Sequence, residues 1–242
     1  MTVQLRGHDL PSGPYADAVE PGPERPQGSS QATSGHWGLR RGLYRNMGKR
    51  ALDVAFVVVT LPVTVPVILV MALLVALDGG KPFYAQLRVG QGGRVFRMWK
   101  LRSMVVDADE RLETYLATDP DLRAEWDSHQ KLRRDPRITV LGDLLRRSSL
   151  DELPQVLNVL KGEMSLVGPR PMMPSQRKIY PGKAYYRLRP GLTGLWQVSA
   201  RNDSVFSFRA ACDETYDRRL SVWLDLKLIL FTVVVVLRGT GR

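Results

Sequence analysis

Cysteine and histidine are scarce in this chain. A single cysteine, Cys212, stands among 242 residues, which excludes an intramolecular disulfide framework and favours a reducing compartment. The three histidines are His8, His36 and His129, and the first two lie in a segment without apolar periodicity. Histidine-rich metal sites and histidine-based catalytic triads are therefore disfavoured.

Acidic residues are missing from two stretches. Residues 40–50 carry five Lys and Arg, residues 79–106 carry six, and neither stretch contains an acid. The whole chain has 35 Lys and Arg against 24 Asp and Glu, a formal charge of +11. This balance indicates an anionic partner: nucleic acid, anionic lipid or a phosphorylated substrate. Nucleic acid is disfavoured, because no nucleic-acid module is present and the basic charge adjoins a long apolar segment.

The N-terminal region has the composition of a tail. Residues 1–36 contain 5 Pro, 5 Gly and 4 Ser without apolar periodicity. Such a segment cannot bury enough surface to offset its ordering entropy, so we expect it to be disordered. Its start has mixed charge and no apolar run follows, so it is not a secretory signal. A basic juxtamembrane segment, residues 37–50, comes next.

One apolar segment stands out. Residues 54–77 are 24 residues without a charge, and as a straight helix they would cover roughly 36 Å, enough to cross a bilayer. Pro62 and Pro66 lie near its middle and favour a kink. Both flanks are basic, and basic flanks prefer the cytoplasmic side. We therefore expect residues 51–78 to form a re-entrant helix that breaks near Pro66, with a kinked crossing helix as an equal alternative on charge and proline alone.

The remainder, residues 79–242, has mixed helix and strand patterns. Residues 82–98 are typical of a strand pair around a glycine turn. Helical patterns cover four further segments, at residues 107–117, 121–134, 141–147 and 153–161. Prolines then break the chain into loops. Residues 223–237 fit a strand, a buried helix or an interfacial helix, and of these we expect an interfacial or domain-packed helix. The sequence predicts an α+β fold, a small mixed cytosolic domain on the re-entrant membrane segment with amphipathic interfacial helices.

An acidic pair, Asp151 and Glu152, precedes Pro154. Proline fits the first turn of a helix, where its missing N–H is not needed. Capping of that helix is therefore the simplest interpretation of the pair. In a strongly basic domain, paired carboxylates also suit binding of a divalent metal or attack on phosphorus. Spacing alone leaves both interpretations open.

Two basic motifs fit phosphate recognition. Arg170 lies between Pro169 and Pro171, which predicts a guanidinium on a stiff, non-helical loop suited to bidentate phosphate binding. In residues 96–104, an extended chain would place Lys100 and Arg102 on one face, where they could contact phosphates or anionic headgroups. A surface arginine and a solvated strand edge are the plain alternatives.

Four motifs occur together in the order typical of one family. They are Lys100-Leu101-Arg102-Ser103-Met104, Ser149-Leu150-Asp151-Glu152-Leu153-Pro154-Gln155, Gly162-Glu163-Met164-Ser165-Leu166-Val167-Gly168-Pro169-Arg170-Pro171 and Arg189-Pro190-Gly191-Leu192-Thr193-Gly194. From about residue 49 to 242 the chain resembles the bacterial monotopic phosphoglycosyl transferases, closest to the small enzymes that initiate exopolysaccharide synthesis. In that family a re-entrant helix breaks at a Ser-Pro pair, and Pro66 matches the proline.

Two positions depart from the family pattern. Val65 replaces the usual serine, so the expected break rests on Pro62 and Pro66. Leu101 replaces the usual phenylalanine, a packing change that should not touch the chemistry. Residues 1–36 lie outside the resemblance, and the chain looks like the family's minimal form.

The resemblance implies a reaction. A hexose-1-phosphate would pass from a UDP-sugar to undecaprenyl phosphate, with galactose slightly preferred over glucose. Asp151 would attack the β-phosphorus and expel UMP, and Glu152 would help to hold Mg²⁺ or act as a general base. The resemblance thus implies Asp151 and Glu152 as the metal ligands. Lys100, Arg146 and Arg170 match basic residues near the phosphates, to which we add Arg102 as a substrate-binding residue.

The resemblance also implies a place in the cell. The enzyme would sit on the bacterial inner membrane, held at an anionic lipid bilayer with the catalytic domain facing the cytoplasm. The oligomeric state stays open, with a homodimer among the options. A non-catalytic membrane scaffold of a polysaccharide assembly complex is the alternative from another functional class.

Overall fold

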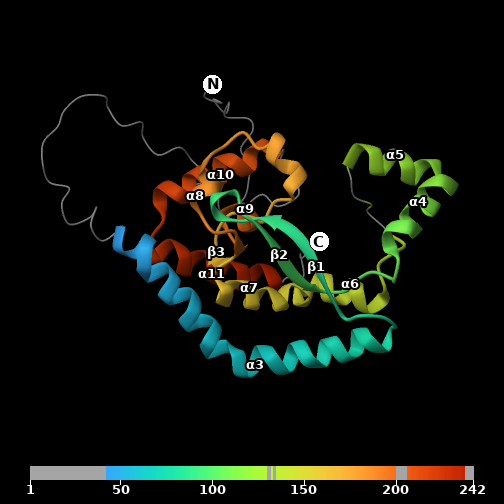
Figure 1. The fold of residues 1–242 in the computed structure, drawn as a ribbon, viewed down its shortest axis with the longest axis horizontal. Helices are drawn as coiled ribbons and strands as arrows, with labels where there is room; N and C mark the ends of the chain where they lie inside the picture. Colours follow the sequence, from blue (N-terminus) through green and yellow to red (C-terminus); the bar gives the residue numbers. More distant parts are fainter. Residues whose placement is uncertain (1–41, 130–131, 133–134, 200–205, 238–242) are drawn as a thin grey trace, which may run out of the picture. The chain divides into compact units, whose positions relative to one another are not determined.

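The structure is a computed structural model that describes residues 42–129, 132, 135–199 and 206–237. The expected tail, residues 1–36, and residues 37–41 of the basic segment 37–50 lie outside the described residues. Figure 1 shows the helices and short strands that follow. Their bounds are η1 Tyr44–Gly48, α3 Lys49–Leu77, β1 Phe83–Val89, η2 Gln91–Gly93, β2 Val95–Leu101, α4 Ala108–Thr118, α5 Pro120–His129, α6 Val140–Arg147, η3 Leu150–Gln155, α7 Val156–Lys161, β3 Ser165–Val167, η4 Pro174–Lys178, α8 Ala184–Arg187, β4 Gly191–Thr193, α9 Leu195–Ser199, α10 Phe206–Arg219 and α11 Val222–Leu237.

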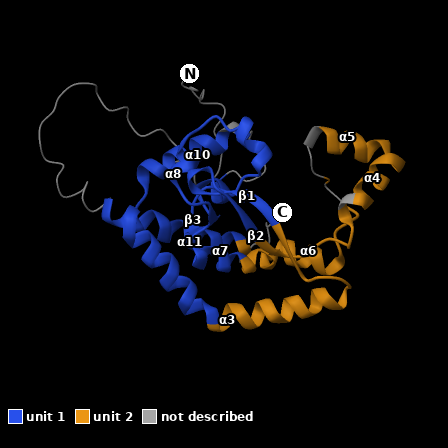
Figure 2. Ribbon diagram, in the orientation of Figure 1, with its two compact units in different colours: residues 1–61, 86–98, 155–235 blue, residues 62–85, 99–154, 236–242 orange. Residues whose placement is uncertain are grey.

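The chain divides into two compact units, coloured in Figure 2. Unit 1 comprises residues 1–61, 86–98 and 155–235, and unit 2 comprises residues 62–85, 99–154 and 236–242. The division runs through α3, between Leu61 and Pro62. Each unit is described by itself below.

Helix α3 is the long apolar helix that the sequence predicts. Together with η1 it forms a helical stretch, Tyr44–Leu77, that is long and apolar enough to cross a membrane by length and composition. The helical assignment continues through Pro62 and Pro66. Proline's fixed φ is compatible with a helix, so each proline removes one backbone hydrogen bond without ending the helix. No non-helical residues therefore separate two helices here, and the re-entrant path stays a prediction.

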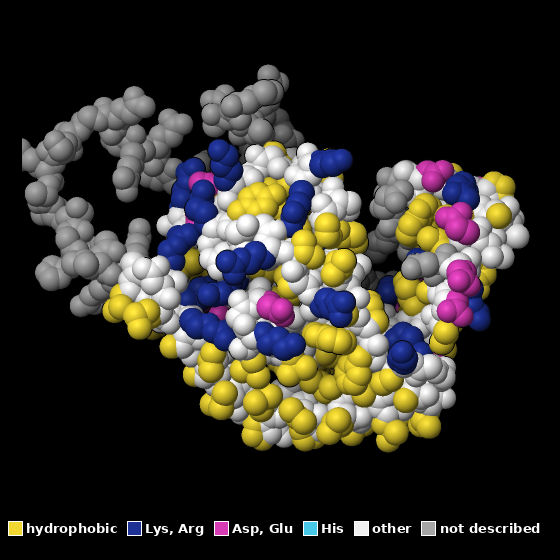
Figure 3. All heavy atoms as spheres, in the orientation of Figure 1, with side chains coloured by type: hydrophobic (Ala, Val, Ile, Leu, Met, Phe, Trp, Pro, Cys, Tyr) yellow, Lys and Arg dark blue, Asp and Glu magenta, His cyan; other side chains and the backbone are white. Residues whose placement is uncertain are grey.

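The apolar side chains of α3 are largely exposed. Val59 and Leu77 each keep 77% of their surface exposed, and Val63 keeps 70%. Figure 3 shows hydrophobic side chains gathered along this helix at the lower edge. An apolar surface of this extent is unusual for a protein in water and indicates a membrane or protein partner.

Buried polar contacts hold the beginning of α3 within unit 1. Asp225 of α11 has no exposed surface and accepts hydrogen bonds from the Tyr44 hydroxyl, Lys49 Nζ and the Tyr216 hydroxyl, each at 2.6 Å. Asp53, also without exposed surface, accepts from Ser165 Oγ and the Leu166 amide at 3.0 Å. These two carboxylates join α3 to β3, α10 and α11.

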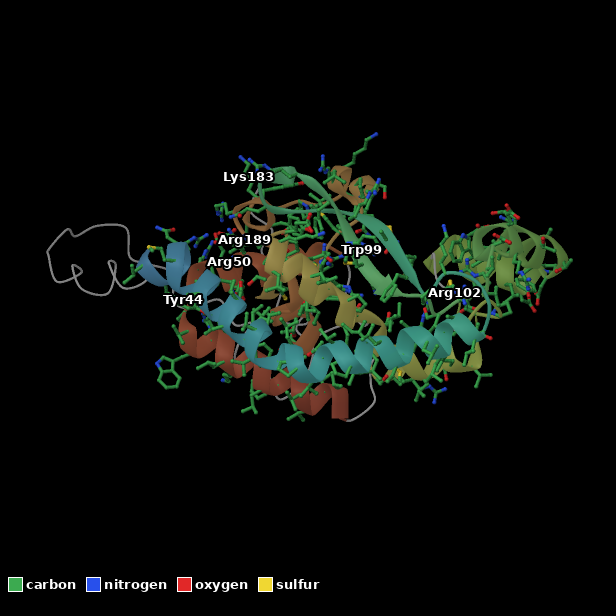
Figure 4. The ribbon with its side chains drawn as sticks, turned by 60° about the horizontal axis from the view of Figure 1, so that its bottom comes forward. Tyr44, Arg50, Trp99, Arg102, Lys183 and Arg189 are labelled. Carbon is green, nitrogen blue, oxygen red and sulfur yellow. The ribbon has the colours of Figure 1, made fainter. Side chains whose placement is uncertain are left out.

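Two arginines bind the C-terminal end of α7. Arg50 donates to the carbonyls of Val159 and Leu160, the latter at 2.7 Å, and Arg189 donates to the carbonyl of Gly162 at 3.0 Å. Both arginines are labelled in Figure 4. Carbonyls at a helix end have no partner within the helix, and positive charge there is favourable. The family motif residues around α7 are thus tied to the start of α3.

A small parallel sheet carries the motif loops of unit 1. Strands β3 and β4 pair with Ser165 opposite Gly191 and Val167 opposite Thr193. The backbones that follow approach so closely that a Cβ at Gly168 would lie 2.2 Å from the Arg189 carbonyl oxygen. Glycine is required at this position because no side chain fits. An aromatic core made of Val89, Met172, Tyr180 and Tyr185 packs in the same unit.

Unit 2 has two apolar clusters. Ala72 and Val75 of α3 pack with Leu101 and Leu145, which attaches the second half of α3 to β2 and α6. Helices α4 and α5 form a hairpin with its own core, made of Leu112, Leu116, Leu122, Trp126 and Leu132. The hairpin therefore adds a separate small layer to this unit.

Most predicted elements are confirmed. The strand pair occurs as β1 and β2, the polar helices as α4 and α5, and residues 222–237 as the helix α11. One prediction was wrong in detail: Asp151 and Glu152 do not precede an α-helix that begins at 153. They lie inside the 3-10 helix η3 with Pro154, and α7 begins only at Val156. Pro154 is the fifth residue of η3, so it lies inside that helix and removes one backbone donor from it.

The anchor of α3 can be tested by removing the carboxylate of Asp225. In Asp225→Ala, Lys49 would stay buried without its counter-charge, which costs about 3–5 kcal/mol. We expect the melting temperature followed by circular dichroism in detergent to fall by roughly 10 °C. Glu214→Gln, which removes a half-exposed carboxylate from α10, is the control and should change it by little. Equal melting temperatures for the two variants would contradict this role of Asp225.

Candidate active site

The acidic pair follows a sharp reversal of the chain. Helix α6 ends at Arg147, and Ser149 adopts a left-handed conformation with φ of 58° before η3 begins at Leu150. The Ser149 amide donates to the Arg146 carbonyl at 3.2 Å, and the Glu152 amide donates to the Ser149 carbonyl at 3.2 Å. A non-glycine residue in this conformation costs about 1–2 kcal/mol. This conformation of Ser149 turns the chain so that η3 lies beside β2.

Lys100 lies between the two carboxylates of the pair. It is the second-last residue of β2, and its Nζ lies 2.8 Å from Glu152 Oε1 and 3.5 Å from Asp151 Oδ2. Only 14% of the Lys100 side chain and 9% of the Asp151 side chain are exposed, against 30% for Glu152. The ammonium is therefore enclosed, and Glu152 has the more open carboxylate.

The surroundings change the acidity of these groups. Burial raises the pKa of the Asp151 carboxyl, the charge of Glu152 adds to this, and Lys100 and Arg146 oppose it. Burial alone would lower the pKa of Lys100, but the charges of Glu152 and Asp151 outweigh it and raise that pKa. The lysine is thus kept positive, while Asp151 is a carboxylate whose charge depends on its cationic neighbours.

Arg146 is positioned by close packing of α6 on the chain after β2. Its Nε donates to Ser103 Oγ at 2.8 Å. The Thr139 side chain caps α6 by accepting from the Gly142 amide at 2.9 Å. A Cβ at Gly142 would lie 1.9 Å from the Ser103 carbonyl oxygen, so only glycine allows this approach. The sequence predicted Arg146 but gave no signal for Ser103, whose role depends on a contact 43 residues along the chain.

Arg102 has a structural partner. It is the residue after β2, and its Nη2 donates to the carbonyl of Val75 in the last turn of α3 at 2.8 Å. Figure 4 labels it beside that end of α3. A side-chain donor at the last turn satisfies a carbonyl that the helix leaves free. Its predicted contact with substrate stays a prediction.

Arg170 belongs to unit 1 and is exposed on the non-helical loop that follows β3. Its guanidinium carbon lies 5.7 Å from the ring centroid of Trp196. One cluster in unit 2 consists of Lys100, Arg146, Asp151 and Glu152. Arg170 belongs to the other unit.

The donor set of the cluster fits Mg²⁺. Within the described part of the chain, no three His, Cys, Asp or Glu side chains gather to form a metal site. Magnesium, however, is commonly bound by one or two carboxylates, with waters and substrate phosphates completing its six ligands. The adjacent carboxylates of Asp151 and Glu152 suit that mode, and a closed protein cage is not needed.

The model of one protein family, the bacterial sugar transferases, matches residues 44–239. The chain belongs to the bacterial sugar transferase family. This sugar transferase is 45% identical over 195 residues to the UDP-galactose-lipid carrier transferase of Erwinia amylovora, an alignment that covers 80% of this chain and 41% of that protein. It is 44% identical to the exopolysaccharide production protein ExoY of Rhizobium meliloti, with 81% and 88% covered.

A third relative is named for its reaction. It is the UDP-glucose:undecaprenyl-phosphate glucose-1-phosphate transferase of Caulobacter vibrioides, 37% identical, with 78% of this sugar transferase and 69% of that protein covered. The chain spans about two fifths of the Erwinia relative and most of the Rhizobium one. The family resemblance read from the motifs is thereby confirmed.

Replacement of Lys100 should change the pH dependence of the sugar transferase. Lys100→Met removes the cation that opposes the raised pKa of Asp151, so this pKa should rise further. We expect the acidic limb of a rate–pH profile to move to higher pH, with kcat/KM lower by on the order of a hundredfold. Lys100→Arg keeps the charge and should keep the limb near its original place. An acidic limb that stays fixed in Lys100→Met would contradict the coupling.

Proposed function

We propose that the chain transfers a sugar-1-phosphate from a UDP-sugar to undecaprenyl phosphate, as the first membrane step of exopolysaccharide assembly. The observation that carries the proposal is the enclosed Lys100 between the carboxylates of Asp151 and Glu152, in a chain whose relatives bear the names given above. We further propose galactose as the sugar, because the relative named for galactose is 45% identical and the one named for glucose is 37% identical.

The proposed reaction has two displacements at one phosphorus. A carboxylate oxygen of Asp151 attacks the β-phosphorus of the donor, and the bond from that phosphorus to the bridging oxygen breaks, so UMP leaves with the bridging oxygen. A phosphate oxygen of undecaprenyl phosphate then attacks the same phosphorus and releases the Asp151 carboxylate. No net proton or electron is consumed. Lys100 supports this path, since its charge opposes the rise that burial causes in the pKa of the Asp151 carboxyl.

A divalent cation belongs to the proposal. Asp151 and Glu152 would hold Mg²⁺ together with the phosphates of the donor, and its charge would offset the charge that the leaving phosphate develops. Lys100 and Arg146 orient and neutralise the same groups from the protein side. In this assignment Glu152 is the more accessible of the two metal ligands, because its carboxylate is the more exposed of the pair.

We place the enzyme at the bacterial inner membrane with the catalytic residues on the cytoplasmic side. The exposed apolar surface of α3 supports membrane attachment. The acceptor has a long hydrocarbon tail, so its phosphate is available only at headgroup depth. Basic residues 40–50 and 79–106 would add attraction to anionic lipid, about 1 kcal/mol per residue close to the surface.

The assigned nucleophile can be tested with Asp151→Asn. Because an amide cannot attack phosphorus in this way, we expect UMP release from UDP-galactose to fall by a factor of on the order of 10³ or more. The measurement is UMP release by purified protein in detergent, with and without undecaprenyl phosphate and with EDTA. Asp143→Asn removes a half-exposed carboxylate from α6 in the same unit and should keep full activity.

Three results would distinguish the proposed transferase from the scaffold and test the assigned nucleophile. Turnover that needs both Mg²⁺ and the lipid, and that Asp151→Asn lacks, supports the transferase. Retained turnover in Asp151→Asn would refute the nucleophile. If folded wild-type protein releases no UMP from any UDP-sugar and does not bind UDP, the non-catalytic membrane scaffold is the remaining function.

The path of α3 is tested separately. Cysteines are introduced on either side of the helix, as Gly42→Cys and Lys81→Cys, in a chain whose own Cys212 is fully buried. A re-entrant helix places both on the cytoplasmic side, so a membrane-impermeant maleimide should label both only after spheroplasts are lysed. The unsubstituted chain controls for Cys212. Labelling of either position in intact spheroplasts would refute the re-entrant path.

A further inference from the structure

A pair of arginines meets at one indole ring in unit 1. The guanidinium carbons of Arg170 and Arg209 lie 5.7 and 5.2 Å from the ring centroid of Trp196 in α9. Arg209, from the first turn of α10, also lies 4.9 Å from the ring centroid of Phe206. Cation–π contact with two rings holds the Arg209 guanidinium in place, and a guanidinium held in place is suited to bind an oxyanion.

The loop that carries Arg170 is fixed along its backbone. Arg209 Nη2 donates to the Arg170 carbonyl at 2.8 Å, and Arg88 Nη1 donates to the Pro171 carbonyl at 3.2 Å. On the other side, the Gly191 amide donates to the Pro169 carbonyl at 2.8 Å. Three consecutive carbonyls are thus held, while the Arg170 side chain itself stays exposed. A rigid backbone with a free guanidinium is suited to an incoming ligand.

The charge of the two arginines is poorly balanced by the fold. Among the residues that the structure describes, neither Arg170 nor Arg209 forms an ion pair at salt-bridge distance. Asp213, the acid that acts on Arg209, accepts a hydrogen bond from the Tyr180 hydroxyl at 2.7 Å. Burial raises the pKa of Asp213 to about 7, against the opposing effects of Tyr180 and Arg209. At neutral pH its charge is therefore only partial.

Two like charges are thus held together without a full counter-charge. Burial lowers the pKa of Arg209, Asp213 opposes this and the charge of Arg170 adds to it, so the arrangement is unfavourable for the free protein. A dianionic phosphate would remove the repulsion and accept hydrogen bonds from both guanidinium groups. Arg209 was not singled out by the sequence, because no motif points to it and α10 is mostly polar.

We infer that Arg209 and Arg170, stacked on Trp196, form a binding site for a substrate phosphate. The inference rests on the proposed function, since it assigns Arg209 to the same reaction. The phosphate could belong to the nucleotide or to the lipid acceptor, and both present the same oxyanion chemistry to the arginines. Arg209 is a phosphate-binding residue in this assignment, and Trp196 positions it.

The experiment compares Arg209→Gln with Arg218→Gln. Both remove one positive charge from α10, but the Arg218 side chain is 75% exposed and pairs with Glu214 within the helix. Binding of UDP and UMP is measured by calorimetry on the full chain in detergent. Steady-state kinetics then give the KM for the UDP-sugar and the KM for undecaprenyl phosphate. Binding of UDP needs no turnover, so it reports on this site even if the transfer reaction is not found.

We expect Arg209→Gln to weaken the binding of one of the two substrates by about tenfold or more. Arg218→Gln should bind both substrates as the unsubstituted chain does. A higher Kd for UDP and a higher KM for the UDP-sugar identify the nucleotide phosphate. Unchanged UDP binding with a higher KM for undecaprenyl phosphate identifies the lipid phosphate. Arg209→Lys keeps the charge without the planar fork and should lie between.

A structural role alone would give a different pattern. Arg209→Gln would then lower the melting temperature but leave UDP binding and both KM values equal to those of Arg218→Gln, and this result overturns the inference. If Arg209→Gln does not fold, Arg209→Lys and Trp196→Phe give the same comparison. Equality of both with the control in UDP affinity and in both KM values likewise overturns it.

Discussion

The polar contacts at the beginning of α3 are the constraint on which the rest of unit 1 depends. The helix offers few apolar contacts to the fold, because side chains such as Val59 and Val63 are exposed. Its attachment is therefore made by Asp225, which accepts three hydrogen bonds, and by Asp53, which accepts two. Buried charges stabilise little unless every partner is present. Such a network instead fixes one geometry, so α3 docks on β3, α10 and α11 in a single way.

The same elements carry the motif loops. Arg50, next to the anchoring Lys49, binds carbonyls at the end of α7, and Ser165, which donates to Asp53, is the first residue of β3. The loop with Arg170 follows β3 directly. The start of the apolar helix and the phosphate-binding candidates are thus joined through a few hydrogen bonds. The start of the long apolar helix and the loop with Arg170 are for this reason parts of one folding unit.

The sequence predicted the parts of the site better than their contacts. The pair Asp151 and Glu152 stands out because it precedes Pro154 in a strongly basic domain, and Lys100 because it lies in a strand pattern. Their meeting joins residues 52 positions apart, which no local period encodes. Residues of one strand face were expected together, yet β2 ends at Leu101, so Arg102 leaves the strand direction and binds the carbonyl of Val75.

Two further features could not be predicted from the sequence: the type of helix around Pro154 and the role of Arg209 in the polar helix α10. Pro154 marks the start of a helical segment, but the choice between 3-10 and α-helix depends on how η3 turns after Ser149. The amphipathic pattern of α6 revealed its buried face, whereas nothing in the sequence of α10 separates Arg209 from the other charged residues of that helix. Its partners, Trp196 and Arg170, come from other elements and only tertiary structure brings them together.

Charge balance connects the two sets of residues to one chemical problem. The cluster of Lys100, Asp151 and Glu152 has two carboxylates for one ammonium, and Arg146 brings it only to neutrality. A sugar nucleotide adds a negatively charged diphosphate, and two like charges 4 Å apart repel by about 4 kcal/mol at an effective dielectric constant of 20. If Asp151 is the nucleophile, as we propose, its carboxylate cannot approach the phosphorus unless further positive charge binds the donor. In the proposed reaction a divalent cation would supply part of this charge, and the phosphate site inferred for Arg170 and Arg209 would be a further source of it.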